Sequence, residues 1–227
     1  AEAWVVAADR ARPDVCYSGA DDGHFKGWDL RAPRRPVFDD GGTHGAGVCS
    51  ISCCPQVEHL VCTGSYDEAL RLWDVRRLCA GEPVAECLRG ELACGGGVWT
   101  ARWHPTRPDL LLTALMHHGF GLVQLHPDTY ADDTDHRHQK SQQQQRPPPP
   151  PPNTTTEHLS CNARPAAAAR LAWRYEAHSS LAYGADWCRC EAAGGTGGEQ
   201  LVATCSFYDR LLHLWHPPRL PAGWSSS

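Results

Sequence analysis

The chain of 227 residues contains no long apolar run, so it offers no candidate for a membrane-spanning helix, which needs about 20 consecutive apolar residues. Its first residues include no basic segment followed by an apolar stretch, so we expect no secretory signal peptide in this chain. Basic residues are not in excess: 21 Lys and Arg stand against 26 Asp and Glu, whereas nucleic-acid-binding proteins usually carry a basic stripe. These absences predict a cytoplasmic protein that binds neither a membrane nor nucleic acid.

Several motifs with chemical meaning are also missing. The 12 cysteines include no CxxC pair, and the spacings Cys53-Cys54 and Cys188-x-Cys190 fit neither a zinc finger nor a small disulfide framework. We therefore expect reduced cysteines packed as small apolar residues, no metal site and no cofactor. The chain contains neither a GxSxG nucleophile elbow nor a glycine-rich nucleotide loop between a strand and a helix. The second absence disfavours a methyltransferase.

An internal repeat with a period near 45 residues is present. Trp28 and Trp73 are each followed by Asp and each preceded, six residues earlier, by another Asp (Asp22 and Asp67). Trp215 has Asp209 at the same distance, and in a further copy, ALMHHGFGLV at 114–123, His117 and Val123 stand in the Asp and Trp positions. Each copy divides into three or four short strand-like runs separated by turn signals. This pattern is typical of an all-β fold, the β-propeller built from WD repeats.

The repeat predicts about four blades, at 1–40, 44–85, 95–175 and 178–217. Residues 1–126 hold the first two and a half to three blades, 171–217 complete the third and form the last, and 218–227 are a tail. Residues 127–170 form a Gln/Pro/Ala-rich insert whose composition predicts disorder, with a polyproline II segment at 147–152 that would suit a proline-binding partner. Rings of this repeat often have seven blades, and the chain begins with Ala, so we expect the C-terminal half of a larger ring.

Propeller topology sorts the polar motifs onto two faces. The turns between second and third strands share one face with the segments that lead into the first strands, and those first strands line the central channel. The motifs expected on that face are Asp21-Asp22, Tyr66-Asp67, Gly96-Gly97, His117-His118, Tyr183-Gly184-Ala185-Asp186 and Tyr208-Asp209. The insert and residues 192–200 fall on the opposite face. We expect Asp22, Asp67, Asp209 and His44 to hold blades together, while His117 either replaces Asp as the turn's hydrogen-bonding group or has a functional role.

Four strings depart from the generic repeat: GGVWTARWHP, LMHHGF, YGADW and LVATCSFYD. In this order they resemble the C-terminal half of the WD-repeat family of diphthine methyl ester hydrolases, which has the older name diphthine methyltransferase. The resemblance covers residues 1–126 and 171–216. It implies hydrolysis of the methyl ester of methylated diphthine on translation elongation factor 2, giving diphthine during diphthamide biosynthesis. The implied partner is therefore elongation factor 2.

Candidate residues for this chemistry follow from their types and from the face on which they are expected. His117 or His118 would act as general base, Asp186 would orient an imidazole or hold the substrate's quaternary ammonium group, and Gly96-Gly97 would offer backbone N–H donors. Ser206, Cys205 and an activated water are alternative nucleophiles. Trp99, Trp187 and Tyr208 would face the cation with their rings, and Asp22 would add a substrate contact. For both tryptophans the alternative is packing in the channel wall, and for the whole chain it is a non-catalytic protein-binding scaffold.

Overall fold

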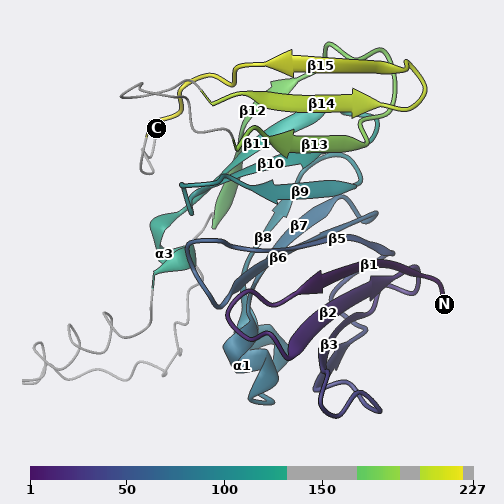
Figure 1. Ribbon diagram of the computed structural model, residues 1–227, viewed down its shortest axis with the longest axis vertical. Helices are drawn as coiled ribbons and strands as arrows, with labels where there is room; N and C mark the ends of the chain where they lie inside the picture. The colour runs from purple at the N-terminus through teal and green to yellow at the C-terminus, as the bar shows by residue number, and fades with distance from the viewer. Residues whose placement is uncertain (132–167, 190–199, 222–227) are drawn as a thin grey trace, which may run out of the picture.

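The computed structural model describes residues 1–131, 168–189 and 200–221, which form four antiparallel sheets stacked side by side (Figure 1). Most of the predicted insert, including the proline run at 147–152 and its proposed partner site, lies outside the described residues, as do 190–199 and the tail beyond 221. Within the described part, no helix is long and apolar enough to cross a membrane.

Each sheet is a meander whose strand order follows the chain. Blade 1 contains β1 (Ala3–Ala8), β2 (Val15–Ala20), β3 (Phe25–Asp29) and β4 (Phe38–Asp40). Blade 2 contains β5 (Val48–Cys53), β6 (Leu60–Ser65), β7 (Ala69–Asp74) and β8 (Leu88–Ala93). Blade 3 contains β9 (Thr100–Trp103), β10 (Leu110–Ala114), β11 (Phe120–Leu125) and β12 (Ala169–Tyr175). Blade 4 contains β13 (Gly184–Trp187), β14 (Val202–Ser206) and β15 (Leu211–Trp215). The first strands β1, β5, β9 and β13 contact one another in series, so the predicted β-propeller architecture is confirmed.

Two details differ from the sequence-based expectation. The fourth strand of blade 2 is β8, which begins at Leu88, beyond the predicted limit of residue 85. Two short helices, α1 (Val75–Cys79) and α2 (Val84–Cys87), precede it, and the Asp74 side chain caps α1 by accepting a hydrogen bond from Arg76 N. In blade 3, α3 (Pro127–Tyr130) follows β11, and β12 begins at Ala169, within the segment predicted as insert.

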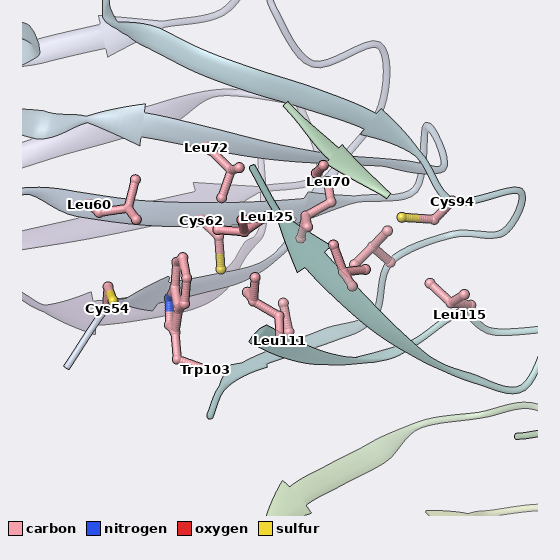
Figure 2. Packing of buried hydrophobic residues seen from close by; sticks show 14 residues of the cluster. Cys54, Leu60, Cys62, Leu70, Leu72, Cys94, Trp103, Leu111, Leu115 and Leu125 are labelled. Atoms are coloured by element: carbon pink, nitrogen blue, oxygen red, sulfur yellow. The ribbon is translucent and has the colours of Figure 1, made fainter. Parts of the chain in front are cut away.

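The largest group of buried apolar side chains fills the space between blades 2 and 3 (Figure 2). Leu60 and Leu72 of blade 2 lie opposite Leu111 and Leu125 of blade 3, and each has less than 2% of its surface exposed. Burying a side chain of this size stabilises the fold by roughly 1.5–3 kcal/mol. Three cysteines, Cys54, Cys62 and Cys94, pack among them as small apolar residues, and the ten described cysteines are all free thiols.

Buried polar networks hold blades 2 and 4. In blade 4, the Asp209 carboxylate lies 2.7 Å from His178 Nδ1, His178 Nε2 lies 3.1 Å from Thr204 Oγ1, and Trp215 Nε1 donates to the same hydroxyl. In blade 2, His44 and Trp73 meet Thr63 in the same way. The two networks share this geometry because the corresponding side chains come from the same strand or leading segment of each blade. Asp67 instead accepts hydrogen bonds from Gly45 N and Ala69 N and pairs with Arg71.

The hairpin turns and the segments leading into the first strands lie together on one face, as expected. Gly45 N donates to Asp67, Ser179 N donates to Asp209, and Ala182 N donates to Met116 O, so each leading segment is bonded to a hairpin turn. We call this the turn face. Helices α1 and α3 lie on the opposite side of the molecule from the β14–β15 hairpin (Figure 1).

Candidate functional site

The turn of blade 3, residues 115–119, is built differently from the turns of blades 2 and 4. His117 stands where blade 2 has Asp67, and the Trp position holds Val123, which is fully buried. Thr113 consequently donates its hydroxyl proton to Gly121 O instead of meeting a tryptophan and a histidine. Backbone bonds from Leu115 N to Gly119 O and from His118 N to Leu115 O hold this turn. The two imidazoles are therefore not needed to maintain the blade.

Both imidazoles are exposed and line a pocket of about 490 Å³. Within the described part of the chain neither ring forms a side-chain hydrogen bond, whereas His178 at the back of the pocket is buried and bonded on both nitrogens. The remaining wall of the pocket comes from Gly119, Glu176, Ser179, Ser180 and Leu181. The pocket thus exposes two imidazoles, the side chain most often used as a general base in hydrolysis.

The structure does not bring Asp186 to these histidines. On β13, Ala185 and Trp187 face blade 3 and belong to the core between blades 3 and 4, so Asp186 points to the other side of the sheet. Its carboxylate accepts a hydrogen bond from Trp187 N and lies 3.9 Å from Arg189. An exposed carboxylate on the far side of blade 4 is not in a position to orient His117.

The two candidate nucleophiles lie on opposite sides of β14. Ser206 is buried, and its Oγ has no hydrogen-bond partner among the described residues. Cys205 is exposed, not packed within the strand, because it lies on the side of blade 4 that faces away from blade 3. Neither side chain lines the pocket of His117 and His118.

Three further candidates lie outside the pocket of His117 and His118. Trp187 is only 3% exposed, donates to Arg102 O and packs against the ring of His104 at 4.7 Å, so it is a core residue between blades 3 and 4. Asp22 is exposed at its turn and accepts a hydrogen bond from His24 N. Gly96 lies directly beneath the blade 3 turn, where an added Cβ would be 2.5 Å from Leu115 O, so close approach accounts for this glycine.

Five rings form a continuous row on the turn face, from blade 1 to blade 4. We call it the aromatic row, and it consists of Trp4, Tyr66, Trp99, Tyr183 and Tyr208. Successive ring centroids are 5.6, 5.5, 5.5 and 6.2 Å apart. The hydroxyl groups of Tyr183 and Tyr208 are hydrogen-bonded. Burial, together with this bond, raises the pKa of Tyr183.

The sequence pattern indicated Trp99 and Tyr208 of this row as cation-binding rings, but not Trp4, Tyr66 and Tyr183. The sequence does contain a signal for two of these rings. Trp4, Trp99 and Tyr183 share one position in the repeat, at the start of the first strand, where blade 2 has Cys49. Glu176 and Ser179 of the pocket were not predicted, because they come from an irregular segment without a repeat signature. Among the described residues, no three His, Cys, Asp or Glu side chains gather closely enough to hold a metal ion.

Several known proteins with similar sequences carry one name. No family model matches the chain. The human protein named diphthine methyltransferase is 43% identical over 122 residues, which cover 54% of this chain and 25% of the human protein. The Dictyostelium discoideum protein named diphthine methyltransferase homolog is 30% identical over 225 residues, which cover 95% of this chain and 50% of that protein. The Saccharomyces cerevisiae diphthine methyltransferase is 28% identical over 94% of this chain and 48% of its own length.

The chain therefore spans about half the length of the relatives that match it nearly throughout. A chain in a crystal structure of the mitotic checkpoint complex superposes with a TM-score of 0.61 at 15% identity, covering 96% of this chain and 49% of that one. That likeness supports the propeller fold alone. The sequence matches to proteins of one name in human, amoeba and yeast show that the chain belongs to the diphthine methyltransferase family.

Proposed function

We propose that this chain acts in diphthamide biosynthesis, as part of a hydrolase that removes the methyl ester from methylated diphthine on translation elongation factor 2. The names of its relatives support the pathway. The pocket of His117 and His118 supports the hydrolysis, and it is the observation that carries this proposal. The partner is a folded protein of the translation machinery, so we also propose a cytoplasmic location.

Ester hydrolysis needs an attacking oxygen and a base that is neutral near pH 7. In the proposed reaction, the imidazole of His117 or His118 takes a proton from water while the water oxygen attacks the ester carbonyl carbon. The tetrahedral intermediate then expels methoxide, which receives the proton from the imidazole and leaves as methanol. The other product is the carboxylic acid of diphthine, which ionises at neutral pH. Water is the proposed nucleophile because Ser206 is buried and Cys205 lies on the far side of its sheet.

Transfer of a methyl group, which the relatives' names suggest, fits the described residues less well. Binding of a nucleotide-like methyl donor commonly uses a glycine-rich loop between a strand and a helix of several turns. The longest helix among the described residues is α1, with five residues. Hydrolysis requires only water as co-reactant, which the exposed imidazoles can reach.

A protein-binding scaffold is the second candidate, and the exposed rings of the turn face favour it. Tyr208 and Phe207 expose 59% and 74% of their surfaces on this face. Exposed aromatic rings are common anchors of protein interfaces. A scaffold would bind elongation factor 2 without changing the ester.

The test uses the full-length protein with elongation factor 2 that carries methylated diphthine, followed by mass spectrometry of the modified peptide. We expect either His117→Ala or His118→Ala to slow loss of the methyl group by about 10²- to 10⁴-fold, the usual contribution of a general base, because one of these two imidazoles is the proposed base. His118→Ala is measured in parallel because the two imidazoles share the pocket.

His24→Ala is the matched control, since His24 is a turn-face histidine that already pairs with Asp39 at 2.6 Å. It should turn over like the wild-type protein. Methanol release without consumption of a methyl donor would identify hydrolysis. Full activity in the double variant His117→Ala/His118→Ala, with folding verified by circular dichroism, would eliminate this pocket as the source of the base. No turnover by the wild-type protein would leave the scaffold.

A further inference from the structure

We propose that the aromatic row binds a quaternary ammonium group on the turn face. Taking the proposed function as given, this group is the one carried by methylated diphthine, so the row would hold the modified side chain while its ester is hydrolysed. The identity of the substrate rests on the proposed function, but the recognition of a methylated cation rests on the row itself.

The repeat brings the rings together. Trp4, Trp99 and Tyr183 occupy the same repeat position, where each first strand begins, and therefore lie at the same end of blades 1, 3 and 4. Blade 2 has the smaller Cys49 at this position, and Tyr66 from the neighbouring turn fills the space. Its ring lies 5.6 Å from Trp4 and 5.5 Å from Trp99, so the row continues without a gap.

Local backbone features fix the first rings of the row. The pairing of β1 with β2 shifts register between Ala3 and Val5, and such a bulge re-aims the side chain at Trp4. The Trp4 ring then lies over Gly47 of blade 2, where an added Cβ would be only 2.4 Å from it. A glycine is required at that position because the ring occupies the space of a side chain.

The angles between the rings suit a cation. Tyr66 meets Trp4 at 62° and Trp99 at 80°, and Trp99 meets Tyr183 at 87°. Rings that meet edge to face present π faces in several directions, and a methylated ammonium group is attracted to such faces within about 6 Å of the ring centre. The row is also accessible, since Trp4 and Tyr66 expose 42% and 39% of their surfaces.

The charges at the Trp4 and Tyr66 end of the row favour a positive ligand. The exposed Asp21 lies beside Gly47 at the Trp4 end, and its carboxylate accepts a hydrogen bond from Glu2 N. The turn that carries Tyr66 also includes the exposed Glu68, whereas Asp67 in the same turn is paired with Arg71. Arg71, which follows the turn of Tyr66, is 6% exposed and already paired with Asp67 and Glu91, so its charge is neutralised locally. At the other end of the row, the exposed Arg210 lies in the turn of Tyr208.

The probe is choline chloride, titrated into the full-length protein and followed by the proton resonance of its N-methyl groups. Rings facing these methyl groups shift the resonance upfield. The comparison ligand is 3,3-dimethylbutan-1-ol, which has the same shape without the charge. We expect the neutral ligand to bind about tenfold more weakly, because cation–π attraction is lost.

Trp99→Leu and Tyr66→Leu should each weaken choline binding about tenfold, while Tyr66→Phe, which keeps the ring, should bind like the wild-type protein. Phe207→Leu is the control, because it removes an exposed ring from the hairpin of Tyr208 without breaking the row. Equal binding of the two ligands, unchanged binding by the folded leucine variants, or no choline binding at all would overturn the proposal. Choline binding at the row without methanol release from the modified factor would leave this proposal standing and remove the hydrolysis.

Discussion

At the scale of single residues, the histidines of this chain divide by their surroundings. His117 and His118 are exposed in a pocket, whereas His104 and His44 are buried. Backbone N–H groups can only donate, so the bonds from Thr106 N and Arg107 N make His104 Nδ1 an acceptor and require a neutral ring. Burial lowers the pKa of His104 to about 4, and burial next to Arg71 lowers the pKa of His44 to about 4.

The lowered pKa values of His104 and His44 predict that the folded chain loses stability in mild acid. The unfolded chain binds a proton on each histidine below about pH 6.5, and the folded chain does so only near pH 4, so unfolding takes up protons in between. The stabilisation is therefore complete above pH 6.5 and is lost as the pH falls towards 4. Each ring contributes roughly 2–3 kcal/mol to this change.

His104→Asn tests this prediction, since an asparagine oxygen can still accept from Thr106 N and Arg107 N but does not titrate. Urea denaturation at pH 4.5, 5.5 and 7 should give a smaller pH dependence of the unfolding free energy in the variant. The variant loses packing against Trp187, so its stability at pH 7 should fall. An unchanged pH dependence would show that His104 is not held neutral.

At the scale of the blade, the same threonine position has two different roles. Thr63 Oγ1 lies 2.9 Å from both His44 Nε2 and Trp73 Nε1 in blade 2, while Thr113 of blade 3 bonds only to the carbonyl of Gly121. Both threonines are fully buried. Blade 3 has no such network because Val123 occupies the position of Trp73. The valine is apolar and needs no hydrogen-bond partner, whereas the indole N–H of Trp73 does.

Thr63→Val should therefore destabilise the chain more than Thr113→Val. Thr63→Val leaves His44 Nε2 and Trp73 Nε1 without their hydrogen-bond partner, which costs about 1–3 kcal/mol of stability for each buried group. Thr113→Val removes one hydrogen bond from the carbonyl of Gly121. Thermal or urea unfolding of the two isosteric variants measures the difference directly. Equal destabilisation would contradict a special role for the Thr63 network.

At the scale of the whole molecule, the stack of blades has two apolar ends. On the outward side of blade 4, Leu212 and Leu214 expose 66% and 62% of their surfaces, and at the other end Val6 exposes 71%. Every interior blade buries the matching surface against a neighbour. β15 is also the outermost described strand of its sheet, so its backbone presents unpaired groups.

We expect the chain, prepared as a separate polypeptide, to self-associate through these ends as its concentration rises. The double variant Leu212→Lys/Leu214→Lys should reduce the mass measured by light scattering during size-exclusion chromatography. Leu30→Lys, at an exposed leucine outside the strands, should have little effect. A monomer at all concentrations in the unaltered chain would refute the expectation.

The sequence by itself determined the propeller, because the repeated Asp and Trp positions and the short apolar runs recur at one period. It also identified the turn of His117 as exceptional, since the loss of Asp and Trp at matching positions is visible in the letters alone. The letters also place Trp4, Trp99 and Tyr183 at one position of the repeat.

Only the tertiary structure decided which side of a sheet each candidate faces. Strand residues alternate between two sides, and the sequence does not state which side meets the neighbouring blade. Asp186 and Cys205 therefore lie on the outward side of blade 4, while Trp187 and Ser206 lie in its interior. The aromatic row likewise depends on the stacking of blades. Tyr66 contacts Trp4 and Trp99 across two blade boundaries, although these residues are 62 and 33 positions away from it in the chain.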